Sequence, residues 1–399
     1  MKIDTGKGFI GVWALLGIWS VSALTSLPGL AISPILGDLS TIFKDATELD
    51  IQLLTSLPSL LIIPFILLAG KLSDAVGYIR LLRMGLWVFL LSGLLYFFCD
   101  TINGLILVSV LLGIGAGIIT PLSTSLVSRF FVGRQRTRQF GYSSAVNNLS
   151  LVVATVVTGY LAEIEWRLPF LVYLLPALSL MLVCFIQQAD AENVNSANNE
   201  EFNEKTISSF VNYCALRRYM AYYFLITFVV MAVSVYLPFM MEKYGHDSGT
   251  SGVVIALFFL FIMLPGLVLD RIVAFLGRRL PEFSLLLIAC GLLIVYLSRG
   301  VAGIVVGVLL AGVGYGIAQP YLYDRTAEAA SPDRATFALA LVMTMNYVAI
   351  VLSPVVVDSL QKMLGAKSAG FAFLLNFCIS IAALIVVFIW KLSKSRSRV

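Results

Sequence analysis

Uncharged polar side chains are the residues of this 399-residue chain whose types and positions could do chemistry. They lie inside long apolar segments, where an unpaired amide or hydroxyl is costly, so each must face a cavity or another helix. In a cavity they would donate and accept hydrogen bonds with a bound polar molecule. Hydrogen bonding between helices is the alternative, and we favour it for a lone serine or threonine. We expect the following residues to bind substrate: Ser26, Asn147, Asn148, Tyr236, Tyr315, Gln319, Thr344 and Asn346.

Motifs for covalent, metal or nucleotide chemistry are missing from the sequence. It has no Walker loop, CxxC pair, HExxH or nucleophile elbow. The five cysteines lack metal-ligand spacing, and the single histidine, His246, lies in a polar segment. We therefore expect no enzyme, no metal and no cofactor. Energy for any work must come from an ion or substrate gradient.

A repeated block positions two of these polar residues. Residues 111–122 read LLGIGAGIITPL and residues 310–321 read LAGVGYGIAQPY, and three glycines and a proline match at an offset of 199. The same offset relates Asn147 to Asn346. We interpret the chain as a tandem duplication whose halves face each other across a central cavity, as transporters do.

The composition indicates that the elements carrying these residues are membrane helices. Hydrophobic residues make up 59% and charged residues 12% of the chain, and its mean hydropathy is +0.95. A span needs about 20 apolar residues. Twelve predicted spans follow: 10–36, 51–70, 84–99, 103–128, 140–163, 168–187, 219–241, 249–269, 281–298, 301–323, 335–359 and 368–390.

Basic residues predict the orientation of these spans. With both termini in the cytoplasm, 21 of the 27 Lys and Arg residues fall on the cytoplasmic side. The net charge of +5 therefore reflects topology, and we expect no nucleic-acid partner. The apolar run Phe9–Leu36 is too long for a cleaved signal peptide, so we read it as a retained first helix. We expect a multi-pass monomer in the lipid bilayer of a bacterial inner (plasma) membrane.

A polar linker divides the chain. Residues 188–208 are acidic and rich in asparagine, a composition that cannot bury a core. We expect a six-helix bundle at 1–187, a cytoplasmic linker at 188–216, and a second six-helix bundle with a basic tail at 217–399.

Two segments carry a family resemblance. GKLSDAVGYIR, from Gly70 to Arg80, resembles the loop 2–3 signature of the major facilitator superfamily, and WRLPF, from Trp166 to Phe170, resembles a motif that follows helix five in many members. The resemblance implies an all-α fold of twelve membrane helices in two pseudo-symmetric bundles. Within the superfamily, the layout is most similar to the twelve-span drug:proton antiporter-like exporters.

The loop 2–3 signature implies a gate. Its glycines let neighbouring helices approach closely, and a carboxylate at Asp74 can bond the N-terminus of a facing helix. The resemblance places that partner at helix eleven, near Arg334 and Ala335. We expect Gly70, Asp74, Gly77, Arg80 and Arg129 to form the gate; the alternative is a plain turn with basic anchors.

The sequence departs from the exporters where proton coupling is concerned. The buried arginine of the exporter helix four is replaced by Ser109, and the helix five signature is eroded. We find no carboxylate near a helix midpoint. Any coupling to protons must then use Asp38 or Asp358, near the outer ends of helices one and eleven, and solvated loop acids are the alternative.

We conclude that the chain is a secondary-active transporter that works by alternating access and exports a small amphipathic organic compound, with protons as a candidate coupling ion. Uptake or facilitated diffusion of a polar metabolite is the alternative. A non-transporting receptor or scaffold is a third reading, which measured flux would separate from transport.

Overall fold

The computed structural model describes residues 2–6, 8–32, 39, 42–43, 48–187, 210–246, 248–365, 368 and 370–396. The chain divides into two compact units. Unit 1 comprises Met1–Met220 and Tyr323–Tyr347, and unit 2 comprises Ala221–Leu322 and Val348–Val399. Three helices of the second sequence half therefore contribute residues to unit 1, namely residues 213–220, 323–328 and 335–347.

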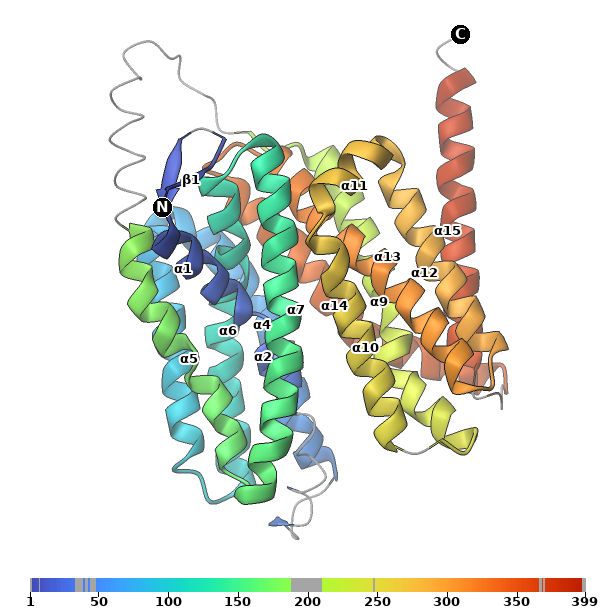
Figure 1. Cartoon of the computed structure of the whole chain (residues 1–399), viewed down its shortest axis with the longest axis horizontal. Helices are drawn as coiled ribbons and strands as arrows, with labels where there is room; N and C mark the ends of the chain where they lie inside the picture. Colours follow the sequence, from blue (N-terminus) through green and yellow to red (C-terminus); the bar gives the residue numbers. More distant parts are fainter. Residues whose placement is uncertain are drawn as a thin grey trace. The chain divides into compact units, whose positions relative to one another are not determined.

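Unit 1 is a helical bundle with a small hairpin at one end (Figure 1). The hairpin pairs Ile3 with Ile10 in antiparallel register. It lies beside the start of α1, at the end of the bundle where α6 stops and α7 starts, and we name this end the hairpin end. The elements are β1 (Lys2–Asp4), β2 (Phe9–Gly11), α1 (Val12–Ala23), α2 (Leu27–Leu30), α4 (Glu48–Val76), α5 (Tyr78–Tyr96), α6 (Ile102–Phe130), α7 (Gly133–Ile164) and η2 (Leu168–Leu174), which continues as helix to residue 187.

Unit 2 consists of helices only among the described residues. Its α10 and α11 are bent by 69° at a short break after Pro265 and Gly266, residues that do not continue a straight helix well. The elements are α9 (Tyr213–Lys243), α10 (Ser248–Gly266), α11 (Leu269–Leu276), η4 (Gly277–Arg279), α12 (Leu280–Leu297), α13 (Val301–Glu328), α14 (Ala335–Met363) and α15 (Phe371–Arg396).

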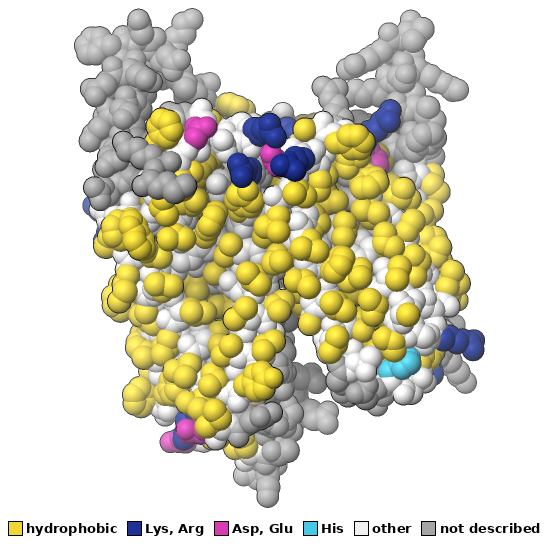
Figure 2. Space-filling view, in the orientation of Figure 1, with side chains coloured by type: hydrophobic (Ala, Val, Ile, Leu, Met, Phe, Trp, Pro, Cys, Tyr) yellow, Lys and Arg dark blue, Asp and Glu magenta, His cyan; other side chains and the backbone are white. Residues whose placement is uncertain are grey.

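The predicted spans have counterparts in the helices. Among the described residues, nine helices are long and apolar enough to cross a membrane, and the bent α10–α11 pair makes a tenth. Shorter apolar helices at Val12–Ala23 and Phe371–Val387 stand where we predict the first and last spans. Hydrophobic side chains cover the middle of each unit on the face seen in Figure 2, and charged side chains gather near its ends. The all-α membrane architecture predicted from the sequence is confirmed.

Two boundaries differ from the prediction. The first span is not one helix from residue 10, because Phe9–Gly11 is a strand and α1 stops at Ala23. Pro28 lacks the N–H that would continue the helix through this turn, so a short α2 starts afresh at Leu27. The second difference is at α13, which ends at Glu328, five residues beyond its predicted end at residue 323. Asp324 is therefore part of the helix.

The repeated glycines bring helices together in the same way in both units. A Cβ on Gly117 of α6 would lie 2.6 Å from the Phe65 Cβ of α4. In unit 2, a Cβ on Gly316 of α13 would lie 2.2 Å from the carbonyl oxygen of Ile262 on α10. Both distances are shorter than a side chain tolerates, so only glycine permits this packing. Close helix packing is therefore what these two glycines provide.

Candidate functional site

A buried carboxylate on α13 accepts two short hydrogen bonds at the hairpin end of unit 1. The Asp324 side chain is only 1% exposed. Its Oδ1 accepts a hydrogen bond from the Arg136 Nε at 2.7 Å, and its Oδ2 accepts one from the Thr137 hydroxyl at 2.6 Å. Since an isolated buried charge is costly, this pairing holds the end of α13 against the first turn of α7.

Glu328, one turn further along α13, extends the cluster. Its Oε1 lies 2.8 Å from the Arg136 Nη2, and its other oxygen bonds Arg325 on the same helix. The Arg136 guanidinium, whose side chain is 12% exposed, thus bridges two carboxylates of α13. We name Arg136, Thr137, Asp324 and Glu328 the latch.

The beginning of α14 packs beside the latch within unit 1. A Cβ on Gly70 of α4 would lie 2.6 Å from the Ala340 Cβ. The Ser125 hydroxyl of α6 is hydrogen-bonded to the Thr336 hydroxyl, and both residues are buried. The ends of α13 and α14 therefore contact α4, α6 and α7 through small and polar residues, with aromatic packing of Phe140 on Tyr323 beside them.

Asn147 joins α7 to the turn between α1 and α2. Its Oδ1 accepts a hydrogen bond from the Thr25 hydroxyl at 3.0 Å, and its Nδ2 donates to the Ser26 hydroxyl at 2.8 Å. All three residues are half-buried. Nearer the hairpin end, the Trp19 Nε1 donates to the Gln139 Oε1 at 3.1 Å. The α1–α7 seam is thus lined by amide and hydroxyl groups.

Three other predicted binding residues of unit 1 are placed differently. Asn148 is buried, and its Nδ2 donates to the Ser144 carbonyl on its own helix at 2.8 Å. Thr344 is also buried and donates to the Ala340 carbonyl at 2.8 Å. Asn346, the repeat counterpart of Asn147, is half-buried on α14. The sequence prediction of a role in substrate binding stays a prediction for all three.

Unit 2 contains a second polar group, between α9 and α13. The Gln319 Nε2 donates to the Tyr223 hydroxyl at 3.0 Å. The Tyr315 hydroxyl is 3.4 Å from the Thr227 hydroxyl. Two aromatic hydroxyls and an amide are therefore brought together by residues four apart on each helix, which share one helix face. Of these four residues, the sequence analysis proposes Tyr315 and Gln319 for substrate binding.

Tyr236 and Asp358 meet in unit 2. The Tyr236 hydroxyl donates to the Asp358 Oδ1 at 2.7 Å and lies 3.1 Å from the Pro354 carbonyl. This contact links a predicted binding residue on α9 to a predicted proton-coupling residue on α14. The other coupling residue, Asp38, lies outside the described residues.

A single family model covers most of the chain. The model described as Major Facilitator Superfamily matches residues 14–354. The chain belongs to the major facilitator superfamily. Its family and fold are those of major facilitator transporters, and the resemblance inferred from the loop 2–3 signature is confirmed.

Relatives of known name share only part of their length with this chain. The quinolone resistance protein NorA of Staphylococcus aureus is 30% identical over 146 residues, which are 35% of this chain and 37% of NorA. The multidrug transporter protein MdtP of Bacillus subtilis is 29% identical over 150 residues, 37% of this chain and 27% of MdtP. The match thus covers 37% of the length of NorA and 27% of the length of MdtP.

Solved structures share the major facilitator fold over nearly the whole chain. The proton:xylose symporter XylE, bound to 6-bromo-6-deoxy-D-glucose, superimposes with a TM-score of 0.75 at 15% identity. The likeness covers 95% of this chain and 95% of XylE. At this identity it is a likeness of fold.

The superfamily loop signature spans the end of α4, Gly77 and the start of α5. Gly77 precedes α5 with a φ of 86°, a conformation that glycine adopts without strain. Arg80 is exposed one turn later. The Arg129 guanidinium lies over the Tyr78 ring, 4.1 Å from its centroid, as in a cation–π contact. Asp74 belongs to α4, but its side chain is outside the described part of the chain, so its role in a gate stays a prediction.

None of the four latch residues is among the site residues predicted from the sequence. Asp324 follows the apolar run 301–323 and precedes Arg325, so its sequence position is typical of the start of a loop. A signal was present nonetheless. Asp324 and Glu328 are four residues apart, hence on one helix face, and α7 starts with the basic run from Arg134 to Arg138.

Proposed function

We propose that this chain is a secondary-active exporter of small amphipathic organic compounds that works by alternating access as a monomer in a bacterial plasma membrane. Membership of the superfamily supports transport as the activity. The names of NorA and MdtP, a quinolone resistance protein and a multidrug transporter, support export of drug-like molecules. The observation that carries the proposal is the latch, because it joins helix ends from both sequence halves through a buried ion pair.

The latch supplies the closed state of one gate. The hairpin end carries many of the basic residues that the positive-inside rule assigns to the cytoplasm, so we assign this end to the cytoplasm. Paired with Arg136 and Thr137, Asp324 holds the cytoplasmic ends of α7 and α13 together while substrate leaves on the other side. When the latch opens, water replaces these partners, so the buried carboxylate is not left unpaired in either state.

Uncharged hydrogen-bonding groups set the substrate class. The α1–α7 seam offers Asn147, Thr25 and Ser26, and the α9–α13 group offers Tyr223, Tyr315 and Gln319. Both sets combine donors, acceptors and apolar neighbours and contain no charged side chain. They suit a neutral or weakly charged compound with aromatic surface, which can bind to rings and amides without a counter-ion.

We propose protons as the coupling ion and Asp358 or Asp38 as the carrier. Asp358 supports the idea because its carboxylate accepts a hydrogen bond from Tyr236, which links α14 to α9. A carboxylate that exchanges a proton on one side and is covered on the other would couple export to the proton gradient.

Flux through proteoliposomes tests the proposal. The purified protein is reconstituted, a fluorescent quinolone is loaded, and efflux is followed with and without an imposed pH gradient. We expect saturable efflux that a pH gradient accelerates and that Arg136→Ala slows at least tenfold. Flux that ignores the gradient would point to facilitated diffusion. No flux for any of a panel of amphipathic compounds would contradict export.

A further inference from the structure

Two main-chain hydrogen bonds occupy equivalent places in the two sequence halves. The N–H of Val132 donates to the Thr5 carbonyl at 3.0 Å. The N–H of Ser331 donates to the Phe210 carbonyl at 3.0 Å. Val132 and Ser331 are related by 199 residues, the offset of the sequence repeat. In the first half, the segment before α1 is therefore bonded to the loop after α6. In the second half, the segment before α9 is bonded to the loop after α13 in the same way.

The first contact uses the turn of the N-terminal hairpin. Thr5 is 1% exposed, and its N–H and hydroxyl both donate to the Gly8 carbonyl, at 2.9 and 3.1 Å. Gly6 has a φ of 85°, and a Cβ there would lie 2.9 Å from the Val132 carbonyl oxygen. Asp4 accepts a hydrogen bond from the Gln135 side chain at 3.3 Å. The turn thus fits closely against the residues that start α7.

The second contact uses the residues that precede α9. Val211 forms an antiparallel bridge with Ala330, and the N–H of Asn212 donates to the Ala329 carbonyl at 2.8 Å. The Ser331 side chain, in a residue 1% exposed, accepts from the N–H of Phe210 at 3.2 Å. Residues 210–212 are therefore paired along the chain that leaves α13.

These contacts flank the latch from both sides. Val132 precedes Arg136 by four residues, one turn of α7. Ala329 directly follows Glu328, the last residue of α13. A shift of either helix end by one turn, about 5.4 Å, would separate Arg136 from Asp324. Main-chain bonds next to each partner oppose such a shift.

We propose that Thr5–Gly6 of the hairpin and Phe210–Asn212 are positioning segments, one in each half, that hold α7 and α13 in the register at which the latch closes. The inference rests on the latch assigned under the proposed function, but it does not depend on which compound is carried. Removing one segment should loosen the latch without removing any latch residue.

A cross-link between two helices reports the closed state directly. In a variant whose native cysteines are replaced, Ser125→Cys and Thr336→Cys place thiols where two hydroxyls are in contact. Oxidative disulfide formation is timed in native membranes. Gly6→Ala should slow it about three- to tenfold, as expected for the loss of a good hydrogen bond. Gly8→Ala is the matched control, because nothing lies within 4 Å of a Cβ at that position of the same turn.

The second segment and the latch complete the test. Ser331→Ala should slow the cross-link by a similar factor, and Asp333→Ala, at an exposed residue of the same loop, should leave it unchanged. In an Arg136→Ala background, Gly6→Ala should have little further effect. Unchanged cross-linking in Gly6→Ala and Ser331→Ala, or a full effect of Gly6→Ala without Arg136, would overturn the proposal. If the Gly6→Ala variant does not reach the membrane, the cross-linking rate of the Ser331→Ala variant tests the proposal. Normal cross-linking behaviour without any flux would contradict the proposed function and not the positioning role.

Discussion

At the scale of single residues, surroundings separate the carboxylates of this chain. Asp324 is buried and accepts from a guanidinium and a hydroxyl, so its charge is held by short, directed bonds. Asp100 carries a charge of the same sign but is 75% exposed and pairs with Arg167 in a loop. Exposed pairs contribute about 0–1 kcal/mol, whereas removing one partner of a buried pair costs about 3–5 kcal/mol. Removing the Asp324 carboxylate should therefore have a larger effect than removing the Asp100 carboxylate.

Neutralising Asp324 should impair transport and leave insertion intact. We expect Asp324→Asn to lower turnover at least tenfold, because the amide keeps the bond with Thr137 but leaves the half-buried Arg136 with Glu328 alone. Turnover in proteoliposomes, normalised to protein content, measures the effect. Glu165→Gln is the matched control, since its partner Arg167 is 3.7 Å away in an exposed pair. Equal turnover for the two variants would show that the latch does not act in the cycle.

Removing the Asn147 amide should weaken substrate binding. Asn147→Ala removes an amide that can bond the substrate and that donates to Ser26, whereas Thr25 keeps its bond to the Ser22 carbonyl. One hydrogen bond to the substrate is worth about 0.5–1.5 kcal/mol, so we expect roughly two- to tenfold weaker affinity. Fluorescence titration of the purified protein with the compound transported in the flux assay measures this. Ser20→Ala, whose hydroxyl bonds only its own helix, serves as the control. An unchanged dissociation constant for Asn147→Ala would remove this residue from the binding site.

At the scale of elements, glycine contacts decide which helices pack. Gly115 of α6 lies against the main chain of Phe89 on α5, and its repeat counterpart Gly314 of α13 lies against Ser284 on α12. The fourth helix of each half therefore touches two neighbours through glycines. Helices that approach this closely gain van der Waals contact, which lipid does not supply between them.

A methyl group at one of these contacts should destabilise the protein. In Gly316→Ala the new Cβ would meet the Ile262 carbonyl oxygen at 2.2 Å, a main-chain atom that cannot turn aside. We expect a cost of about 1–3 kcal/mol and a lower melting temperature in detergent. Gly300→Ala, with nothing within 4 Å of its Cβ, should melt like the unmodified protein. If both variants melt at the same temperature, the α10–α13 contact is looser than described.

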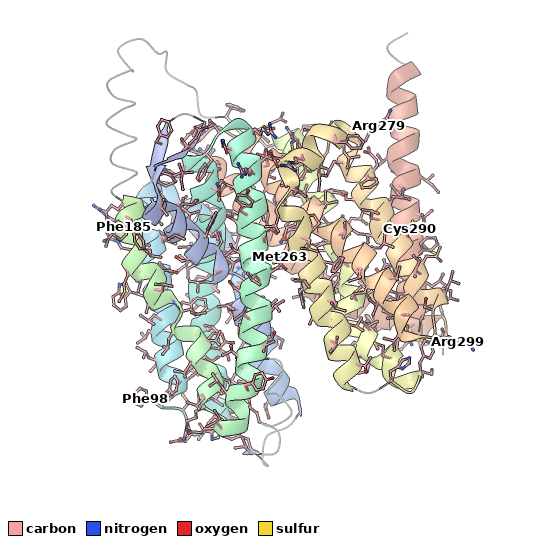
Figure 3. All side chains as sticks on the ribbon, viewed as in Figure 1. Phe98, Phe185, Met263, Arg279, Cys290 and Arg299 are labelled. Carbon is pink, nitrogen blue, oxygen red and sulfur yellow. The ribbon has the colours of Figure 1, made fainter. Side chains whose placement is uncertain are left out.

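At the scale of the whole molecule, apolar surface and charge are arranged for a bilayer. Large hydrophobic side chains are exposed on both units, among them Trp87 (60%) and Phe239 (67%). Exposure of these apolar side chains is favourable in lipid. Charged side chains are costly there, so they lie at the helix ends. In unit 2, Arg279 and Arg299 lie at opposite ends of α12 (Figure 3).

The orientation can be tested with these two arginines. In a cysteine-free variant, Arg279→Cys should react with a membrane-impermeant maleimide only after the inner face is opened, and Arg299→Cys should react in intact cells. The reason is the excess of basic residues on the side that carries Arg279. Labelling of whole cells and of inverted vesicles distinguishes the two. The reverse pattern would place the termini outside.

The candidate site was only partly predictable. Asn147 and Asn346 stand out in the sequence because an amide in an apolar repeat has to be satisfied, and Asn147 is indeed bonded by two neighbours. Asp324 did not stand out, since a charge at the edge of an apolar run looks the same whether it is solvated or buried. The hairpin was missed because two three-residue strands leave no periodic pattern.

The sequence by itself determined the helical membrane architecture and the superfamily, because hydropathy and the Gly70–Arg80 signature are local properties of the chain. Tertiary structure alone decided that Arg136 meets Asp324, across 188 residues, and that Thr5 and Phe210 bond equivalent loops. An ion pair across that separation depends on how helices pack. A main-chain hydrogen bond uses the N–H and C=O groups that all residues except proline share, so no residue type predicts it.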